Sequence, residues 1–288
     1  MQSPSFVATD FAISAFSLNA PLNVPLNVPL PLTALLFGLG LFVGALSGLL
    51  GIGGGLLMVP SLTAVGFGVL PATATSLVGV MFSAVSGSVR NWRAGELDLR
   101  RSVGLAIGGI PAAQLGAIAG EHLSPSTLAF AFAGLQGLAM YLMGVRQRLG
   151  QLEGDQDDRH SDSWFDWPSI GIGAIAGYLA GLFGVGGGVV MVPLQTLILR
   201  TPIKAAVRVS LGAIVAIGAS GLIRHTLLGN VLWIPGLCLG CGGLLGAQFG
   251  SRILPHLSTA FVNFLFRGLL LLMATFMVYE GWIALPSV

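Results

Sequence analysis

A ten-residue phrase that occurs twice, each time inside a long apolar run, constrains the fold more than any other feature of the chain. It reads GIGGGLLMVP over residues 51–60 and GVGGGVVMVP over residues 184–193. Glycine leaves backbone amides bare and makes a helix easy to interrupt. Within a bilayer, interrupted backbone is tolerated only where protein buries it or where it lines a wet cavity. Two interruptions at corresponding places in two halves are typical of a transporter's binding site.

The composition places the chain in a membrane. Hydrophobic residues make up 54% of the sequence and charged residues 8%, whereas a soluble domain carries about 25% charged residues. We therefore predict a polytopic protein whose main surroundings are the lipid bilayer. The formal net charge of +2 gives no reason to expect a nucleic-acid partner. Cys238 and Cys241 lie in an apolar stretch with no neighbouring histidine, so we interpret them as helix-packing residues and expect neither a metal site nor a cofactor.

Ten apolar segments are expected, at roughly 32–50, 56–69, 73–89, 102–119, 126–145, 168–184, 188–199, 204–223, 231–250 and 259–282. Residues 1–31 are expected to form an extended, proline-rich tail. The first transmembrane repeat then covers 32–145 and the second covers 168–288. Between them, residues 146–167 are expected to form an acidic cytoplasmic linker.

The two halves match well beyond the glycine phrase, which indicates an internal duplication. An offset of 133 residues aligns the two phrases, and an offset of 134 aligns Ser76 with Ser210 and Arg90 with Arg224. The same offset aligns Gln114 with Gln248. A constant period over this length is the signature of a repeat architecture.

The positions of lysine and arginine favour a topology in which the two repeats are inverted. If the short segments 56–69 and 188–199 each return the chain across the membrane, ten basic residues in the loops and at segment ends are cytoplasmic and only Arg224 is external. If the short segments are not counted, the ratio falls to eight against three, so the positive-inside rule favours the first topology. Five segments per half is an odd number, which inverts the second repeat relative to the first. The predicted fold is an all-α membrane protein of two inverted five-segment repeats, with broken helices or hairpins at the glycine phrases and both termini non-cytoplasmic.

The chemistry expected at the breaks is anion binding. A helix that starts at Leu56 or Val189 presents unpaired N–H groups and the positive end of its dipole, a combination that holds anions without a formal charge. The apolar segments contain one acidic residue, Glu280, near the last membrane exit, whereas a cation pathway usually carries intramembrane carboxylates. Other polar groups within the apolar runs are candidates to complete the site: hydroxyls of Ser76 and Ser210, amides of Gln114 and Gln248, and the cations Arg208 and Arg267.

The duplicated glycine–proline phrase, together with the Ala74-Thr75-Ser76 region, resembles the TauE/SafE sulfite exporter family over about residues 32–282. The resemblance implies an inner-membrane permease for sulfite or a small organosulfur anion such as a sulfonate. It also implies that the motif glycines contribute to the site: Gly53, Gly54, Gly55, Gly186, Gly187 and Gly188. In the second half the stretch Arg208-Val209-Ser210 replaces Ala74-Thr75-Ser76, which makes the half-sites unequal and Arg208 a candidate direct ligand.

We therefore expect a secondary transporter, not an enzyme, that moves a small oxyanion by alternating access. A passive anion channel on the same scaffold is one alternative. The other is an intramembrane serine protease, since Gly218-Ala219-Ser220-Gly221 fits a G-x-S-G pattern and His256 follows one segment later. The sequence leaves open which anion is moved, the direction, the energy source, and whether the protein is a homo-oligomer.

Overall fold

The computed structural model describes residues 30–50, 54–152, 167–253 and 259–285, and these residues form ten helices joined by short connections, with no strand. This confirms the predicted all-α membrane fold. The helices are α2 (Leu30–Leu50), α3 (Gly55–Ala64), α4 (Val69–Arg93), α5 (Leu99–His122), α6 (Pro125–Leu152), α7 (Trp167–Phe183), α8 (Gly188–Ile198), α9 (Ile203–Leu227), α10 (Trp233–Ile253) and α11 (Thr259–Ile283).

Two helices are too short to cross a membrane, and they are the two that follow the glycine phrases. Helix α3 has 10 residues and α8 has 11. At 1.5 Å per residue each is about 15 Å long, half of the ~30 Å hydrocarbon core. By contrast, α4, α5 and α9 are each long and apolar enough to span it. Helices α3 and α8 are therefore half-helices that begin inside the protein. At the end of the first repeat, α6 continues to Leu152, beyond the expected boundary at residue 145.

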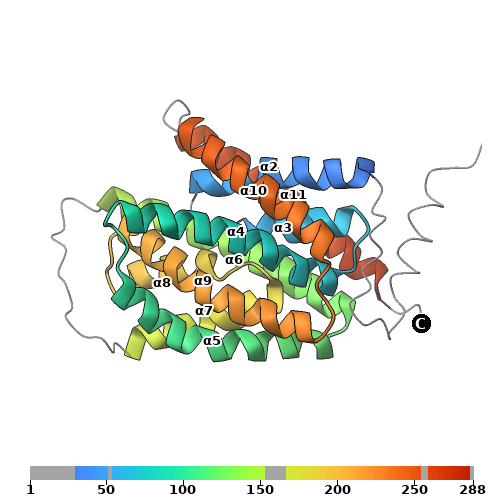
Figure 1. The fold of residues 1–288 in the computed structure, drawn as a ribbon, viewed down its shortest axis with the longest axis horizontal. Helices are drawn as coiled ribbons and strands as arrows, with labels where there is room; N and C mark the ends of the chain where they lie inside the picture. The colour runs from blue at the N-terminus through green and yellow to red at the C-terminus, as the bar shows by residue number, and fades with distance from the viewer. Residues whose placement is uncertain (1–29, 51–53, 153–166, 254–258, 286–288) are drawn as a thin grey trace, which may run out of the picture.

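The first helix of each repeat packs against the fourth helix of the other repeat. The most extensive contacts in the fold join α5 to α7 and α10 to α2. These two pairs lie on opposite sides of the molecule, with α4, α6, α8 and α9 between them (Figure 1). Because α5 corresponds to α10 and α2 to α7, each contact is the repeat equivalent of the other. The halves are therefore interlocked rather than placed side by side.

Both exchanged pairs rely on glycine to bring backbones together. On α7, a Cβ at Gly173, Gly177 or Gly181 would collide with the carbonyl of Leu105, Gly109 or Ala113 on α5. At these contacts the residue numbers increase in the same direction along both helices, so α5 and α7 run parallel. On α2, Gly40 and Gly44 touch Leu239 and Gly243 of α10 in the same parallel sense. Small residues permit this close approach between membrane helices, where packing replaces the hydrophobic effect.

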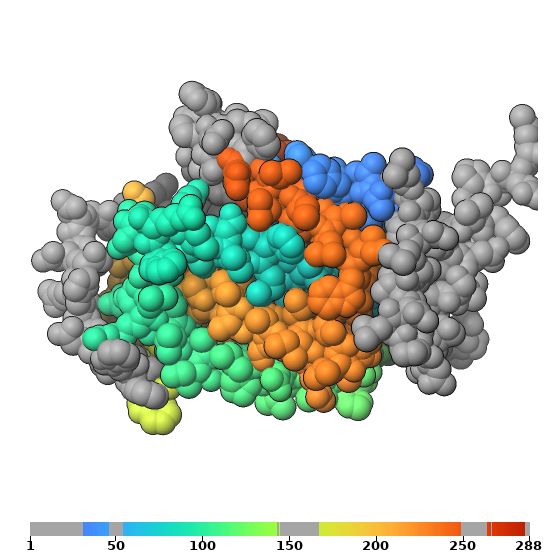
Figure 2. All heavy atoms as spheres, viewed as in Figure 1, coloured from blue at the N-terminus to red at the C-terminus, as the bar shows by residue number. Residues whose placement is uncertain are grey.

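The two central helices, α4 and α9, run antiparallel. A Cβ on Gly87 of α4 would lie 3.0 Å from Leu211 Cδ1, and one on Gly218 of α9 would lie 3.0 Å from Met81 Sδ. The residue numbers of α4 therefore increase in the direction in which those of α9 decrease. Figure 2 shows α4 and α9 next to each other on one face, between α10 and α5. Helices α4 and α9 are repeat equivalents, so this antiparallel crossing relates the two halves directly.

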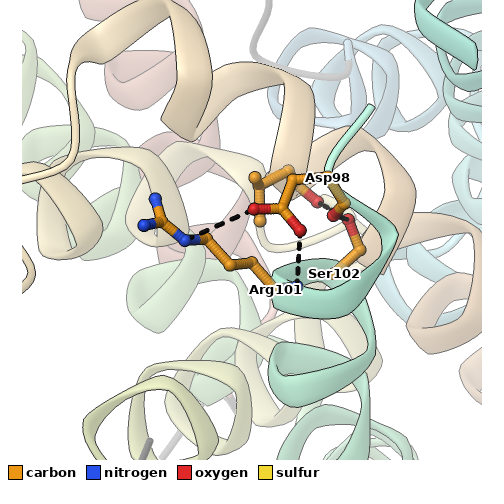
Figure 3. A network of polar contacts seen from close by, with 4 residues as sticks. Asp98, Arg101 and Ser102 are labelled. Carbon is orange, nitrogen blue, oxygen red and sulfur yellow. Dashed lines mark hydrogen bonds and ion pairs between the residues drawn. The ribbon is translucent and has the colours of Figure 1, made fainter. Parts of the chain in front are cut away.

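The start of α5 is anchored to α9 by a capped turn (Figure 3). Asp98 is the N-cap, and its Oδ1 accepts a hydrogen bond from the Arg101 amide at 3.1 Å. Its other carboxylate oxygen lies 3.4 Å from Arg101 Nε. Ser102 Oγ lies 2.8 Å from the Asp98 carbonyl and 3.0 Å from the Val209 carbonyl of α9. This turn fixes where α5 meets the central pair.

Candidate functional site at the two helix breaks

The two glycine phrases adopt the same backbone conformation. Gly54, the N-cap of α3, has φ 69° and ψ −24°, and Gly187, the N-cap of α8, has φ 75° and ψ −14°. This left-handed region is open to glycine and strained for other residues. The sequence repeat is therefore also a repeat of local structure, as the glycine spacing predicts. Gly53 lies outside the described residues.

The two breaks touch each other at the centre of the molecule. A Cβ on Gly55, the first residue of α3, would lie 2.6 Å from Val185 Cα and 2.7 Å from the Gly184 carbonyl oxygen. Only glycine permits this contact between the first half-helix and the second phrase. Residues 54–63 and 180–193 are all buried, so neither described break faces lipid. The breaks are thus brought together, as the prediction of a single site requires.

Several amides at these helix starts have no hydrogen-bond partner among the described residues. The Gly54 carbonyl accepts from Leu57 and Met58, and the Gly187 carbonyl accepts from Val190 and Met191 at 3.1 and 2.9 Å. The preceding amides belong to the first turn, which lacks intrahelical acceptors. They are the N–H groups of Gly55 and Leu56 in α3, and of Gly188 and Val189 in α8. Buried backbone donors are rarely left unpaired, so these N–H groups, which have no partner among the described residues, are candidates to bind a ligand.

The two predicted serines are both buried but are bonded differently. Ser76 Oγ lies 2.7 Å from the Thr73 carbonyl and 2.9 Å from the Gly184 carbonyl, so its proton is directed at backbone acceptors. Ser210 Oγ instead accepts from Gln195 Nε2 at 2.7 Å, which leaves its own proton available. Ser76 thus holds the second glycine phrase, whereas Ser210 lies beside Gln195 in the last turn of α8, about two turns beyond Gly188.

Two buried glutamines on the helices around the breaks were not among the predicted site residues. Gln136 on α6 is 0% exposed, and its Nε2 donates to the Leu56 carbonyl at 3.3 Å. That carbonyl lacks its usual helical donor because Pro60, four residues later, has no N–H. Gln195 on α8 is 1% exposed and supports Ser210. Neither glutamine has a polar repeat equivalent, and each stands alone in an apolar segment, which was the only signal available.

The remaining predicted ligands lie in other surroundings. Arg208 pairs with Glu96 at 2.9 Å, and its side chain is 33% exposed. Arg267 is half-buried on α11, where its guanidinium lies near Gly144 of α6. Gln114 and Gln248 are exposed, on α5 and α10. The structure therefore does not place these four side chains in the buried surroundings of the breaks, and their roles in binding stay predictions.

The residues of the protease alternative are also placed only in part. Ser220 Oγ donates to the Ile110 carbonyl at 2.9 Å and so joins α9 to α5. His256 lies outside the described residues. Cys238 and Cys241 are free thiols on α10. Within the described ranges, no group of three or more histidine, cysteine or acidic residues could hold a metal ion.

Comparison with known proteins agrees with the architecture. The chain is 29% identical over 266 residues to the probable membrane transporter protein YunE of Bacillus subtilis, covering 84% of this chain and 96% of that protein. It is 28% identical over 261 residues to a probable membrane transporter protein of Xylella fastidiosa, covering 87% and 96%. A relative from Methanocaldococcus jannaschii, also a probable membrane transporter protein, is 28% identical and covers 67% and 72%. No solved structure matches the chain.

The family comparison covers nearly the whole helical region. The sequence profile described as sulfite exporter TauE/SafE matches residues 36–277, from the first turns of α2 to the last turns of α11. Both glycine phrases and the junction between them lie inside the match. The chain belongs to the TauE/SafE sulfite exporter family.

Proposed function

We propose that the chain is a secondary transporter of a small oxyanion, sulfite or an organosulfonate, which binds where the two glycine breaks meet. The observation that carries this proposal is the contact between Gly55 and the second phrase, with amides on both sides of it that have no partner among the described residues. Helix N-termini favour anions through their free N–H groups and their dipoles. Two of them at one buried junction can hold a single oxyanion between them.

The division of work within the site follows from its two unequal halves. The amides of Gly55 and Leu56 bind one face of the anion, and those of Gly188 and Val189 bind the other. Ser210 adds a hydroxyl donor that Gln195 orients. Ser76 on α4 donates a hydrogen bond to the second phrase. To bind the anion, its hydroxyl would have to give up this bond and donate to the anion instead. Arg208 and Arg267 supply compensating positive potential, without a direct contact in this conformation.

Inversion of the repeats would supply alternating access. Antiparallel packing of the equivalent helices α4 and α9 supports a twofold axis that runs across these helices rather than along them. The equivalent pair α6 and α11 gives the same indication, because Gly281 lies near Phe130 while Gly144 lies near Arg267. Two inverted halves can exchange conformations about a central site, which opens it to one side and then to the other.

Flux in proteoliposomes tests the proposal. The purified protein is reconstituted, and uptake of radiolabelled sulfite, sulfate, thiosulfate and methanesulfonate is compared with that of empty liposomes. We expect saturable uptake of sulfite or the sulfonate, which an internal load of the same anion accelerates by exchange. Flux that never saturates and shows no exchange would indicate a passive channel instead. Failure of all four anions to move would overturn the proposed substrate class.

A further inference from the structure

We propose that His225 is the proton-binding residue that couples anion movement to a proton gradient, an inference that rests on the proposed transport function. His225 lies in the last turn of α9 and is 0% exposed. An ionisable side chain buried within a spanning helix is costly to keep there, and such residues commonly mark proton relays. Histidine is also the side chain whose ordinary titration range lies nearest physiological pH.

The bonding of the ring identifies the atom that takes the proton. His225 Nε2 lies 2.8 Å from the Gly181 carbonyl oxygen. A carbonyl only accepts, so Nε2 carries the hydrogen and the neutral ring keeps a lone pair on Nδ1. Nδ1 is buried and has no hydrogen-bond partner within the described structure. A hydronium ion that reaches this lone pair gives up a proton: the Nδ1–H bond forms as one O–H bond of the hydronium breaks, which leaves an imidazolium and a water molecule.

The surroundings of the ring provide a counter-charge and a route to water. Helix α5 contributes Glu121, which interacts electrostatically with His225, and the exposed His122. Glu121 is itself exposed and accepts from Asn230 at 2.6 Å. On α9, Arg224 is the residue adjacent to His225 in sequence. Glu121 is thus the acidic group placed to stabilise the imidazolium and to pass a proton inward from the surface.

The hydrogen bond links His225 to the anion site through α7. Gly181 lies in the last turn of α7, three residues before Gly184, whose carbonyl contacts Ser76 and packs on Gly55. A charge on His225 favours hydration of this end of the molecule and so favours separation of α9 from α7. The neutral ring favours the packed arrangement. Proton binding therefore biases the same backbone segment that presents the second half-site.

The first repeat carries a non-titrating equivalent at the same place. Asn91 aligns with His225 at the offset of 134, and both end their helices in the same turn. The Glu96 amide donates to the Asn91 carbonyl at 2.9 Å, and the Asn230 amide donates to the His225 carbonyl at 3.0 Å. Asn91 is also buried, at 6% exposure. Asparagine can donate the hydrogen bond but cannot change its charge, so of these two equivalent positions only His225 can respond to protons.

This comparison supplies the decisive variant, His225→Asn, which keeps a donor toward Gly181 and removes the titration. We expect sulfite exchange in proteoliposomes, with equal pH on both sides, to stay within about twofold of the wild type. A gradient of one pH unit can drive at most about tenfold accumulation per coupled proton. We expect accumulation of several-fold in the wild type and in the control His122→Asn, and none in His225→Asn. Accumulation retained in His225→Asn would overturn the proposal and indicate that the substrate itself carries the proton.

A second measurement judges the proton site without transport. The chain has 4 histidines, so ¹⁵N-histidine NMR resolves few signals, and the one missing in His225→Asn is assigned to His225. We expect its Nδ1 to take up a proton as the pH falls. We expect the anion site to become exposed to solvent in the same pH range. An Nδ1 that stays unprotonated from about pH 5 to pH 8, the range in which an ordinary histidine titrates, overturns the proposal whatever the flux. A wild type that exchanges no anion at all counts against the proposed function instead.

Discussion

At the residue scale, the site depends on backbone conformations that few side chains tolerate. Gly54 and Gly187 occupy the left-handed region, and Gly55 leaves no room for a Cβ against Val185. A side chain in that region costs about 1–2 kcal/mol. The motif glycines therefore act through geometry: they begin the half-helices in a conformation that other residues resist, and the proposed anion would bind the amides that follow.

Gly187→Leu is expected to abolish transport in a protein that still inserts and folds. A Cβ there would lie 2.7 Å from the Ala176 carbonyl, so the first turn of α8 must shift. Gly229→Leu is the matched control, because Gly229 has φ 76° but open space around its Cβ position. Both variants carry the same backbone strain, and only the first alters the site. Proteoliposome flux should be lost in Gly187→Leu and kept in Gly229→Leu; wild-type flux in Gly187→Leu would refute the assigned role.

Gln136→Leu is expected to destabilise the protein by about 1–2 kcal/mol, because it removes the only side-chain donor that the structure shows for the Leu56 carbonyl. The change gives α6 the residue that α11 has at the equivalent position, Leu270. A lower apparent melting temperature in detergent, with sulfite protection reduced, is the expected readout. A melting temperature equal to that of the wild type would show that Gln136 does not support the α3 start.

Repetition determined which polar residues the sequence could single out. Ser76 and Ser210 are a repeated pair and both are buried, but only Ser76 contacts a described break. Gln114 and Gln248 are also a repeated pair, yet both are exposed. Gln136 and Gln195 have no repeated partner, so the duplication gave no reason to select them. In lipid, the outer and inner faces of a helix are equally apolar, so a side chain's direction is not written in the pattern around it.

At the element scale, the contact between α5 and α7 is a run of glycines set against carbonyl groups. Gly173→Val is expected to destabilise it by about 1–3 kcal/mol, since a Cβ there collides with the Leu105 carbonyl. Gly171→Val, on the same helix, meets nothing within 4 Å and serves as the control. Thermal denaturation in detergent should separate the two variants. Equal stability would mean that α5 and α7 are not packed in this register.

The elements themselves were largely predictable, and their partners were not. Ten apolar runs gave ten helices, and the glycine phrases correctly placed the starts of α3 and α8. The exchange of α5 and α10 between repeats was not foreseen. Nearly uniform apolar composition hides which face of a membrane helix meets protein, and the glycines at 173, 177 and 181 acquire their meaning only beside α5.

At the scale of the whole molecule, the interlocking contacts join the two repeats: α2 packs against α10 and α7 packs against α5. Helices α4 and α9 pack against each other between these pairs (Figure 1). The proposed alternating access requires each exchanged pair to move as one body, so that the half-helices stay covered.

Cysteine labelling tests the predicted inversion. Arg93 and Leu227 occupy equivalent, exposed positions at the ends of α4 and α9. In a chain with Cys238 and Cys241 replaced by alanine, Arg93→Cys should react with a membrane-impermeant maleimide only from the cytoplasmic side. Leu227→Cys should react only from the opposite side. Labelling of both positions from the same side of intact cells would exclude inverted repeats and, with them, the proposed alternating access.

Amide NMR tests the central claim most directly, because it observes the four N–H groups that have no partner among the described residues. The protein, ¹⁵N-labelled at glycine, leucine and valine, is titrated with sulfite in nanodiscs, with uncharged dimethyl sulfone as the control. The account predicts that the signals of Gly55, Leu56, Gly188 and Val189 shift together, saturate at one common concentration, and do not respond to the sulfone. Sulfite transport by the same preparation with those four signals unmoved would contradict it.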